Sequence, residues 1–542
     1  MGLSIVVAAA VAFLVLAAFE AWHDSATYDE PVYVSSGVAA ILHHDLADNA
    51  EHPPLFKVLA ALPVLIVHPV VPGDGHWNRN DERAYGARFV ASQMQAGTMH
   101  KVTVAARVIP LVECVLMALA LFALASRLFG PWPGVVAALL WLLDPLVLGL
   151  GHVDGVDLPF ALTTVLVSLS LVRWLDRRDR RSLWWVGAAS GAAASAQVTG
   201  LLLIGLAVGV VVLVGRRAGG RSWAPWRPAG LVLVVAWFTI WLPYIAINPS
   251  VVIHSWVVLP QPYGEGLGYL ATHDTGAAPG FLIGHAWTGA NLWFWPVALV
   301  VKLPAPVLVM LVGGTLALVG LVRSGRIQRS TWHHTLIAVA LPAVILFVVE
   351  LPNPRTLGVR YLLPSLALWI AVASPIALVV GRRLAAVALG AVLGLAAVTT
   401  ALSFPHSISS TAAPFRPGYR VATDSNLDWG QDLTLLATWS RSHHPYVAYF
   451  GPRGITPRDV PGARALIGIP PHAVLGWVAA SASDLTSADR DALAWLRGYC
   501  PVGTLGGTIL LYHFTSAPTS AAGPPAPPPL CTGSVSHRVN GA

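Results

Sequence analysis

Charged side chains are scarce in this sequence. Only 11% of its 542 residues are Asp, Glu, Lys or Arg, whereas 55% are hydrophobic and the mean hydropathy is +0.65. Soluble globular domains carry about 25% charged and about 45 to 50% apolar residues. The composition therefore excludes an ordinary soluble domain and predicts an integral membrane protein.

Cysteine is also rare. The three cysteines, Cys114, Cys500 and Cys531, lie too far apart for a zinc-type cysteine spacing. Cys500 and Cys531 could pair as a disulfide if their region is extracytoplasmic.

The net charge of +7 and the pI near 9.5 would suggest nucleic-acid binding in a soluble protein. Here the arginines lie in short loops between apolar runs, as the positive-inside rule predicts for a membrane protein. Nucleic acid is therefore not expected as a partner.

Long apolar runs make up most of the first 403 residues. A helix needs about 20 apolar residues to cross a bilayer. We predict eleven spans, at 3–22, 102–125, 134–150, 158–173, 184–198, 200–214, 230–247, 292–322, 334–350, 361–380 and 384–403. The run 55–71 is predicted to be an interfacial or re-entrant helix, because a twelfth span would move every later Arg cluster outside.

Arginine sets the predicted orientation. With the N-terminus in the cytoplasm, the loops near 127, 173–181, 216–227, 323–329 and 382–383 all lie inside, and they hold fifteen Arg and two acids. Residues 27–101 then form the first extracytoplasmic loop, with interfacial helices. The chain is predicted to be a multi-pass protein of the plasma membrane whose C-terminal region lies outside.

The character of the sequence changes near residue 404. Residues 404–515 alternate short apolar runs with Gly, Pro and polar clusters, which predicts a small mixed α/β domain outside the membrane. Residues 516–542 form a tail rich in Pro and Ala that is predicted to be disordered, with Cys531 as a tether. The predicted fold class is thus mainly α, a polytopic helix bundle with a small α/β domain.

The stretch 27–57 concentrates the scarce charge, beginning with Asp29 and Glu30 just after the first span. A carboxylate at the membrane surface can act as a general base for a hydroxyl within hydrogen-bond reach. Two acids after a transmembrane helix can also be solvated interface charges. The dipeptide alone does not separate the two interpretations.

A second cluster, Glu51-His52-Pro53-Pro54, follows in the same stretch. The prolines hold Glu51 and His52 in a defined extended backbone. Carboxylate plus imidazole suits a divalent cation or a phosphate-bearing group. The same residues suit a helix start, with Pro in the first turn and an acid near the N-terminus.

Other ionisable residues near the predicted outer surface also have two interpretations. Asp154 and Asp157 either face the same cavity as Asp29 or cap the next helix. Lys302, inside an apolar run, either binds an anion or snorkels to the surface. His285 either ligates a metal or packs in an aromatic-rich loop. Four further side chains either contact a substrate or only form an Asx-rich turn, and the sequence does not separate the two interpretations: Asp424, Asn426, Asp428 and Gln431.

Four segments resemble a known class of membrane enzymes. DEPVY at 29–33 followed by EHPPLFK at 51–57 is similar to the first extracytoplasmic loop of protein O-mannosyltransferases and of bacterial aminoarabinose transferases. GVRYLLP at 358–364 resembles a late loop of these families, and DSNLDWGQDL at 424–433 resembles a motif of bacterial relatives. These are GT-C glycosyltransferases, and the resemblance makes residues 1–403 the catalytic transmembrane domain.

The resemblance implies roles for individual residues. Asp29 matches a catalytic base, with Glu30 beside it. The residues implied or proposed to bind the donor phosphate are Arg107, Arg360, Tyr361 and Lys302. The residues expected near the substrate or a metal are Glu51, His52, Asp154 and Asp157. Glu51 and His285 match a pair of metal ligands in the aminoarabinose transferases, so a divalent cation is a candidate cofactor.

The sequence therefore predicts an inverting glycosyltransferase that moves a sugar from a polyprenyl-phosphate donor to an acceptor hydroxyl at the outer face of a bacterial plasma membrane. The sugar is a hexose or a pentose, and the acceptor is a lipid, glycan or protein. Two alternatives stay open: a transporter or flippase of lipid-linked sugars, and a non-catalytic membrane protein that binds the cell wall. A flippase would carry its polar residues near the bilayer midplane, whereas here they concentrate at the outer surface.

Overall fold

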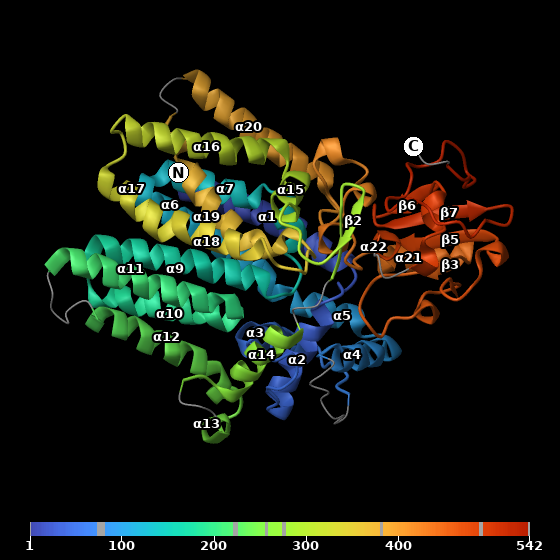
Figure 1. Ribbon diagram of the computed structural model, residues 1–542, viewed down its shortest axis with the longest axis horizontal. Coiled ribbons are helices and arrows are strands. Elements are labelled where there is room, and N and C mark those ends of the chain that lie inside the picture. Colours follow the sequence, from blue (N-terminus) through green and yellow to red (C-terminus); the bar gives the residue numbers. More distant parts are fainter. Residues whose placement is uncertain are drawn as a thin grey trace.

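The protein is a helix bundle with a small sheet domain at one end, as a computed structural model shows (Figure 1). The structure describes residues 2–72, 82–219, 226–254, 258–273, 278–379, 383–486 and 491–539. The fold is mainly α, as predicted.

Nine helices within these ranges are long and apolar enough to span a membrane. They are α1 (Gly2–His23), α5 with α6 (Met99–Ala106 and Val108–Phe129), α9 (Asp157–Arg177), η1 with α11 (Val198–Gly200 and Leu201–Gly219), α12 (Trp226–Ile247), α16 (Ala305–Arg323), α17 to α18 (Arg329–Thr335, Leu336–Ala340 and Leu341–Glu350), η3 to η4 (Val359–Leu362, α19 Leu363–Ala373 and Ser374–Leu378) and α20 (Arg383–Ser403). The chain is thus a multi-pass membrane protein.

The predicted count of eleven is not confirmed, because two predicted spans are shorter helices. The run 134–150 divides into α7 (Pro131–Leu142) and α8 (Pro145–Leu150). The Asp144 carboxylate accepts a hydrogen bond from the Leu146 amide at 2.9 Å and so caps α8. The run 184–198 forms α10 (Arg180–Ala196), which has 17 residues.

The predicted span 292–322 is wrong as a single helix. It divides at Leu303–Pro304 into α15 (Phe294–Lys302) and α16. Pro304 disfavours helical backbone in the residue before it, and Leu303 is extended.

Several Arg-rich loops lie at the end of the bundle opposite the sheet domain (Figure 1). Two contacts join them: Arg127 pairs with Asp176 at 2.8 Å, and His334 contacts Asp176 at 3.0 Å. The C-terminal ends of α6 and α9 and the short helix α17 therefore share one side of the bundle.

The described parts of segments 24–98 and 248–291 form shorter helices and a hairpin. They are α2 (Glu30–His43), α3 (Pro54–Ile66), α4 (Glu82–Ala96), α13 (Val251–His254) and α14 (Gln261–His273), with the hairpin β1 (Pro279–Leu282) and β2 (His285–Thr288). With 13 residues, α3 is too short to span, which agrees with the prediction for 55–71.

The C-terminal region holds a five-stranded sheet in the order β4-β3-β5-β7-β6. Its strands are β3 (Tyr446–Ala448), β4 (Arg464–Ala465), β5 (Gly476–Ser481), β6 (Gly503–Leu505) and β7 (Ile509–Phe514), accompanied by α21 (Leu433–His443) and α22 (Ala482–Thr486). Strand β3 pairs in parallel with β4 and β5, and β7 pairs antiparallel with β5 and β6. The mixed α/β character is as predicted.

The prediction of a disordered tail is wrong for residues 516–539. The Tyr419 hydroxyl donates to the Pro528 carbonyl at 3.0 Å, and the Val539 amide donates to the Gly498 carbonyl at 3.0 Å. Cys500 and Cys531 form a disulfide. Backbone hydrogen bonds and this disulfide hold the tail against the sheet domain, although its composition offers few apolar side chains.

Candidate functional site

A polar cavity of about 160 Å³ opens at the end of the bundle that faces the sheet domain. Its walls come from α2, η1, the end of α18 and the loop before α19. The lining residues are Asp29, Tyr33, Glu51, His52, Arg83, Val156, Gln197, Val198, Thr199, Leu270, Glu350, Asn353, Arg355, Leu357, Arg360 and Tyr361. Five of the predicted site residues are therefore brought together: Asp29, Glu51, His52, Arg360 and Tyr361.

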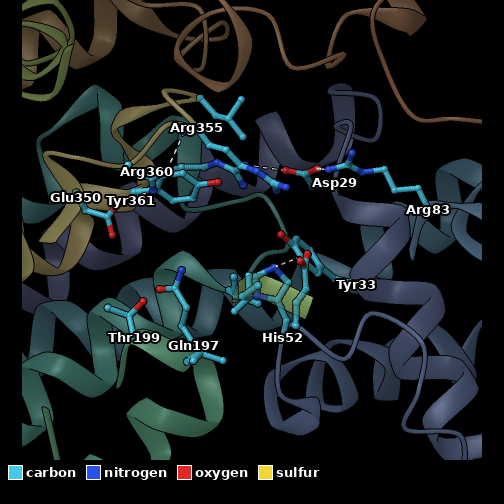
Figure 2. Close-up of a pocket in the computed structure, with 16 residues that line it drawn as sticks. Asp29, Tyr33, His52, Arg83, Gln197, Thr199, Glu350, Arg355, Arg360 and Tyr361 are labelled. Atoms are coloured by element: carbon cyan, nitrogen blue, oxygen red, sulfur yellow. Dashed lines mark hydrogen bonds and ion pairs between the residues drawn. The ribbon is translucent and has the colours of Figure 1, made fainter. Parts of the chain in front are cut away.

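Asp29 and Arg360 form an ion pair on one wall of this cavity. Arg360 Nη2 donates to Asp29 Oδ2 at 2.8 Å, and Arg83 Nη2 lies 3.9 Å from Asp29 Oδ1. Figure 2 shows Arg360, Asp29 and Arg83 in a row. The carboxylate thus lies between two guanidinium groups, in a region with several cations.

Asp157 reaches this wall through Arg360. The residue begins α9 and accepts a hydrogen bond from Arg360 Nη1 at 3.4 Å, although it does not line the cavity itself. Arg360 Nε is buried and has no hydrogen-bond partner. Arg360 is therefore held by two carboxylates, and its Nε–H is left without an acceptor.

Glu51 and His52 lie on the opposite side of the cavity. His52 Nε2 is 3.4 Å from Glu51 Oε1, and the His52 ring meets the Tyr33 ring edge-on at 5.4 Å between centroids. Helix α3 begins at Pro54, so the prolines do start a helix. The helix-start interpretation is confirmed. Glu51 and His52 also line the cavity, and their binding of a cation or phosphate stays a prediction.

Glu30 and Arg107 form a second ion pair, buried beside the cavity. Arg107 is 0% exposed, and its Nε and Nη2 donate to the two carboxylate oxygens of Glu30, each at 2.8 Å. The remaining guanidinium hydrogens donate to the carbonyls of Ala21, Asp24 and Ser25.

All five guanidinium hydrogens of Arg107 thus have acceptors, which argues against the predicted phosphate role. Glu30 also accepts from the amides of Thr27 and Asp154. Burial alone would raise the pKa of Glu30, but Arg107 and these donors outweigh it and lower that pKa. Glu30 is therefore placed as a structural anion and not as a base.

Asp154 contacts the buried pair of Glu30 and Arg107 and does not line the cavity. Its amide donates to Glu30 Oε1 at 3.0 Å. Burial, together with the negative charge of Glu30, raises the pKa of Asp154 well above its usual value. The predicted substrate contact is not seen for this residue.

Lys302 and His285 are also away from the cavity. Lys302 is 2% exposed, and its Nζ donates to the carbonyls of Ile408, Ser410 and Asn426 at 2.8, 2.6 and 2.7 Å. Its three hydrogens are therefore used, and neither phosphate binding nor snorkelling describes it. His285 is exposed on β2 and does not line the cavity with Glu51.

No metal-type group of three side chains lies at this cavity within the described residues. The group that satisfies the distances is Cys500, Cys531 and His537, and its two sulfurs are joined as a disulfide. The structure therefore does not assemble the predicted pair of Glu51 and His285 into a cation site.

Several cavity residues were missed from the sequence. Gln197 and Thr199 lie in the short turn between α10 and α11, and Figure 2 shows them on the side opposite Arg360. Arg355 gave a usable signal, since it lies with Arg360 in a loop predicted to be outside, where arginine is unusual. Gln197 and Thr199 gave none, because a polar turn between two helices is ordinary.

Residues 93–244 match the family model of the dolichyl-phosphate-mannose-protein mannosyltransferases. The predicted resemblance to GT-C glycosyltransferases is confirmed. The match covers the spans α6, α9 and α11 and most of α12. No curated protein sequence matches the chain.

Solved structures of similar arrangement are glycosyltransferases of several kinds. ArnT from Cupriavidus metallidurans bound to undecaprenyl phosphate is 18% identical, with 76% of this chain and 67% of that chain covered and a TM-score of 0.47. The archaeal oligosaccharyltransferase AglB from Archaeoglobus fulgidus, in complex with an inhibitory peptide and a dolichol-phosphate, is 12% identical, with coverage of 95% and 74% and a TM-score of 0.49. The S. cerevisiae Pmt1-Pmt2 complex bound to the sugar donor is 16% identical, with coverage of 52% and 39% and a TM-score of 0.31. At these scores the likeness does not assign any residue.

Proposed function

We propose that this protein is a membrane glycosyltransferase that transfers a sugar from a polyprenyl-phosphate donor to an acceptor hydroxyl. The observation that carries the proposal is the Asp29–Arg360 pair on the wall of a polar cavity at one end of the bundle. In this proposal Asp29 is the base and Arg360 is the cation that binds the phosphate. The name of the matched family, which cites a dolichyl-phosphate sugar, supports a lipid-phosphate donor.

The donor phosphate binds to Arg360, with Arg355 and Tyr361 beside it. Guanidinium groups bind phosphate oxygens with paired, charge-assisted hydrogen bonds. When the phosphate binds, it competes with Asp29 for Arg360. The exchange keeps the cation neutralised and leaves an Asp29 oxygen available for the acceptor.

The transfer is a single displacement. The acceptor oxygen forms a bond to the anomeric carbon as the bond from that carbon to the phosphate oxygen breaks, and the electron pair leaves with the phosphate. Asp29 takes the hydroxyl proton and later releases it to solvent. Arg360 and Arg355 stabilise the charge that develops on the leaving phosphate. Attack opposite the leaving group inverts the anomeric centre.

The cavity is proposed to face the outer side of the plasma membrane, with the N-terminus in the cytoplasm. The Arg-rich loops at the opposite end of the bundle support this orientation. The Cys500–Cys531 disulfide supports it as well, because disulfides persist in oxidising compartments.

Purified protein incubated with a panel of polyprenyl-phosphate sugars and a panel of lipid, glycan and peptide acceptors should release polyprenyl phosphate from at least one donor. Asp29→Asn should lower kcat by roughly 10² to 10⁴, the usual contribution of a general base. Asp179→Asn is the matched control: Asp179 caps α10 through the Ser182 amide, and Asn caps equally well. Wild-type protein that turns over no donor, or a folded Asp29→Asn protein with full activity, would contradict the proposal.

A further inference from the structure

The segment Asp424–Asp432 contacts Arg360 and the loop that leads into Asp29, although none of its residues lines the cavity. It lies between the loop that leads into Asp29 and the loop that carries Arg360. Its Trp429 is 3% exposed and packs in the core of the helix bundle, whereas Trp495 packs in the separate core of the sheet domain. The segment thus joins the two parts of the molecule at the cavity.

One set of contacts holds the loop of Arg360. The Val359 amide donates to Asn426 Oδ1 at 2.9 Å, and Ser425 Oγ donates to the Leu357 carbonyl at 3.2 Å. A side chain at Gly358 would collide with Ser425, so glycine permits this close approach. The backbone on both sides of Gly358 is therefore fixed by the segment.

A second set holds the loop that leads into Asp29. The Ser25 amide donates to the Gln431 carbonyl at 2.7 Å, and the Tyr28 amide donates to the Trp429 carbonyl at 2.8 Å. Gly430, between these carbonyls, has a φ of +95°, which favours glycine. The spacing between Asp29 and Arg360 is thus set by one short piece of chain.

The Trp429 ring also touches Arg360 directly. The guanidinium carbon lies 4.4 Å from the Trp429 ring and 5.0 Å from the Tyr361 ring. Asp29 and Asp157 take hydrogen bonds from the two terminal nitrogens, and Nε stays buried without a partner. A cation over an indole face is strongly attracted when it is desolvated.

We propose that Trp429 is a positioning residue that fixes the plane of Arg360, so that the guanidinium can accept a phosphate in exchange for Asp29. The identity of that anion rests on the proposed function, whereas the fixed plane rests on the contacts alone. Without the ring, Arg360 loses the face that fixes its plane when a phosphate replaces Asp29, and it keeps only Asp157 and the Tyr361 ring. Through this one residue the C-terminal region sets the anion affinity of the membrane cavity.

Three variants test the proposal: Trp429→Leu, Trp429→Phe, and Trp495→Leu as the control for loss of a buried tryptophan. One readout needs no substrate, namely the rate at which phenylglyoxal modifies Arg360, measured by peptide mass spectrometry. The others are the affinity for polyprenyl phosphate in detergent micelles and the separate kcat and KM for the donor.

Trp429→Leu should speed the modification of Arg360 several-fold and weaken polyprenyl phosphate binding roughly tenfold to thirtyfold, with the same rise in KM, because a desolvated cation–π contact is lost. Trp429→Phe, which keeps a smaller ring, should show an intermediate change in both readouts. Trp495→Leu should change neither, even if it lowers the melting temperature.

An unchanged modification rate and affinity in Trp429→Leu would overturn the proposal, as would equal effects in Trp495→Leu. If Trp429→Leu does not fold, Trp429→Phe decides, and wild-type values in both readouts would overturn the proposal. Wild-type protein that neither binds polyprenyl phosphate nor releases it from any donor refutes the proposed function. In that case the modification rates still decide whether Trp429 positions Arg360.

Discussion

Removing Arg107 should destabilise the fold before it affects donor binding. Arg107 is fully buried and gives all its hydrogens to Glu30 and to three carbonyls. If the charges of Arg107 and Glu30 are taken as about 4 Å apart in an effective dielectric constant of about 20, their Coulomb attraction is about 4 kcal/mol. Removal of one partner of a buried pair costs about 3 to 5 kcal/mol, because the other charge stays uncompensated. Arg107→Met should therefore lower the free energy of unfolding by about 4 kcal/mol.

Chemical denaturation of the detergent-solubilised protein, followed by tryptophan fluorescence, measures this loss. The double variant with Glu30→Gln should recover most of it, since no unpaired charge then remains. Arg127→Met is the control: Arg127 pairs with Asp176 at a site where both side chains are about a third exposed. Such a pair contributes about 1 kcal/mol or less. The stability that this pair provides also depends on pH, because Arg107 lowers the pKa of Glu30 in the folded protein. The contribution to the free energy of unfolding is fully present above about 4.3, the pKa of Glu in the unfolded chain, and is lost as the pH falls through the folded pKa of Glu30.

The structural role of Arg107 would be refuted by one combination of results. If Arg107→Met unfolds like the wild type but binds polyprenyl phosphate more than tenfold more weakly, the residue is a phosphate ligand, as its place in the sequence predicts.

Two further predictions concern the C-terminal region. Lys302→Met leaves three carbonyls without a donor and should lower the free energy of unfolding by about 3 kcal/mol or more. The loss should appear as a lower melting temperature and faster proteolysis after residue 404. Unchanged stability with weaker binding of the sugar donor would instead favour a phosphate-binding role for Lys302. Burial raises the pKa of Asp432 to about 7, so its ionisation opposes folding increasingly between about pH 4 and pH 7. The difference in free energy of unfolding between Asp432→Asn and the wild type should therefore be larger at pH 8 than at pH 5. An equal difference at the two pH values would contradict this.

The spans could be predicted because membrane thickness sets a length that is visible along the chain. The breaks in the predicted spans 134–150 and 292–322 also have a signal in the sequence, namely Pro145 after Asp144 and Pro304. A hydropathy average over a whole span hides such single residues. The tail could not be predicted from its composition. Backbone donors and acceptors hold it to the sheet domain, and residue type does not record them.

The candidate site was predicted in part, for a physical reason. Asp29 and Arg360 each stand in a polar loop motif, which is local information. The partners that decide what an ionisable residue does are remote: Glu30 lies 77 residues from Arg107, and Lys302 lies 124 residues from Asn426. Burial and pairing turned these two cations into structural groups, and neither property is visible along the sequence.

The pairing of Ser25 and Tyr28 with Trp429 and Gln431 has a consequence for biosynthesis. Thr434, beside these residues, donates to Ser25 Oγ across 409 residues of chain. Synthesis runs from the N-terminus, so the loop before Asp29 reaches its side of the membrane long before its hydrogen-bond partners exist. A chain that is inserted but unfinished therefore lacks the hydrogen bonds that hold the loop before Asp29. The last of these hydrogen bonds can form only after translation has passed Thr434.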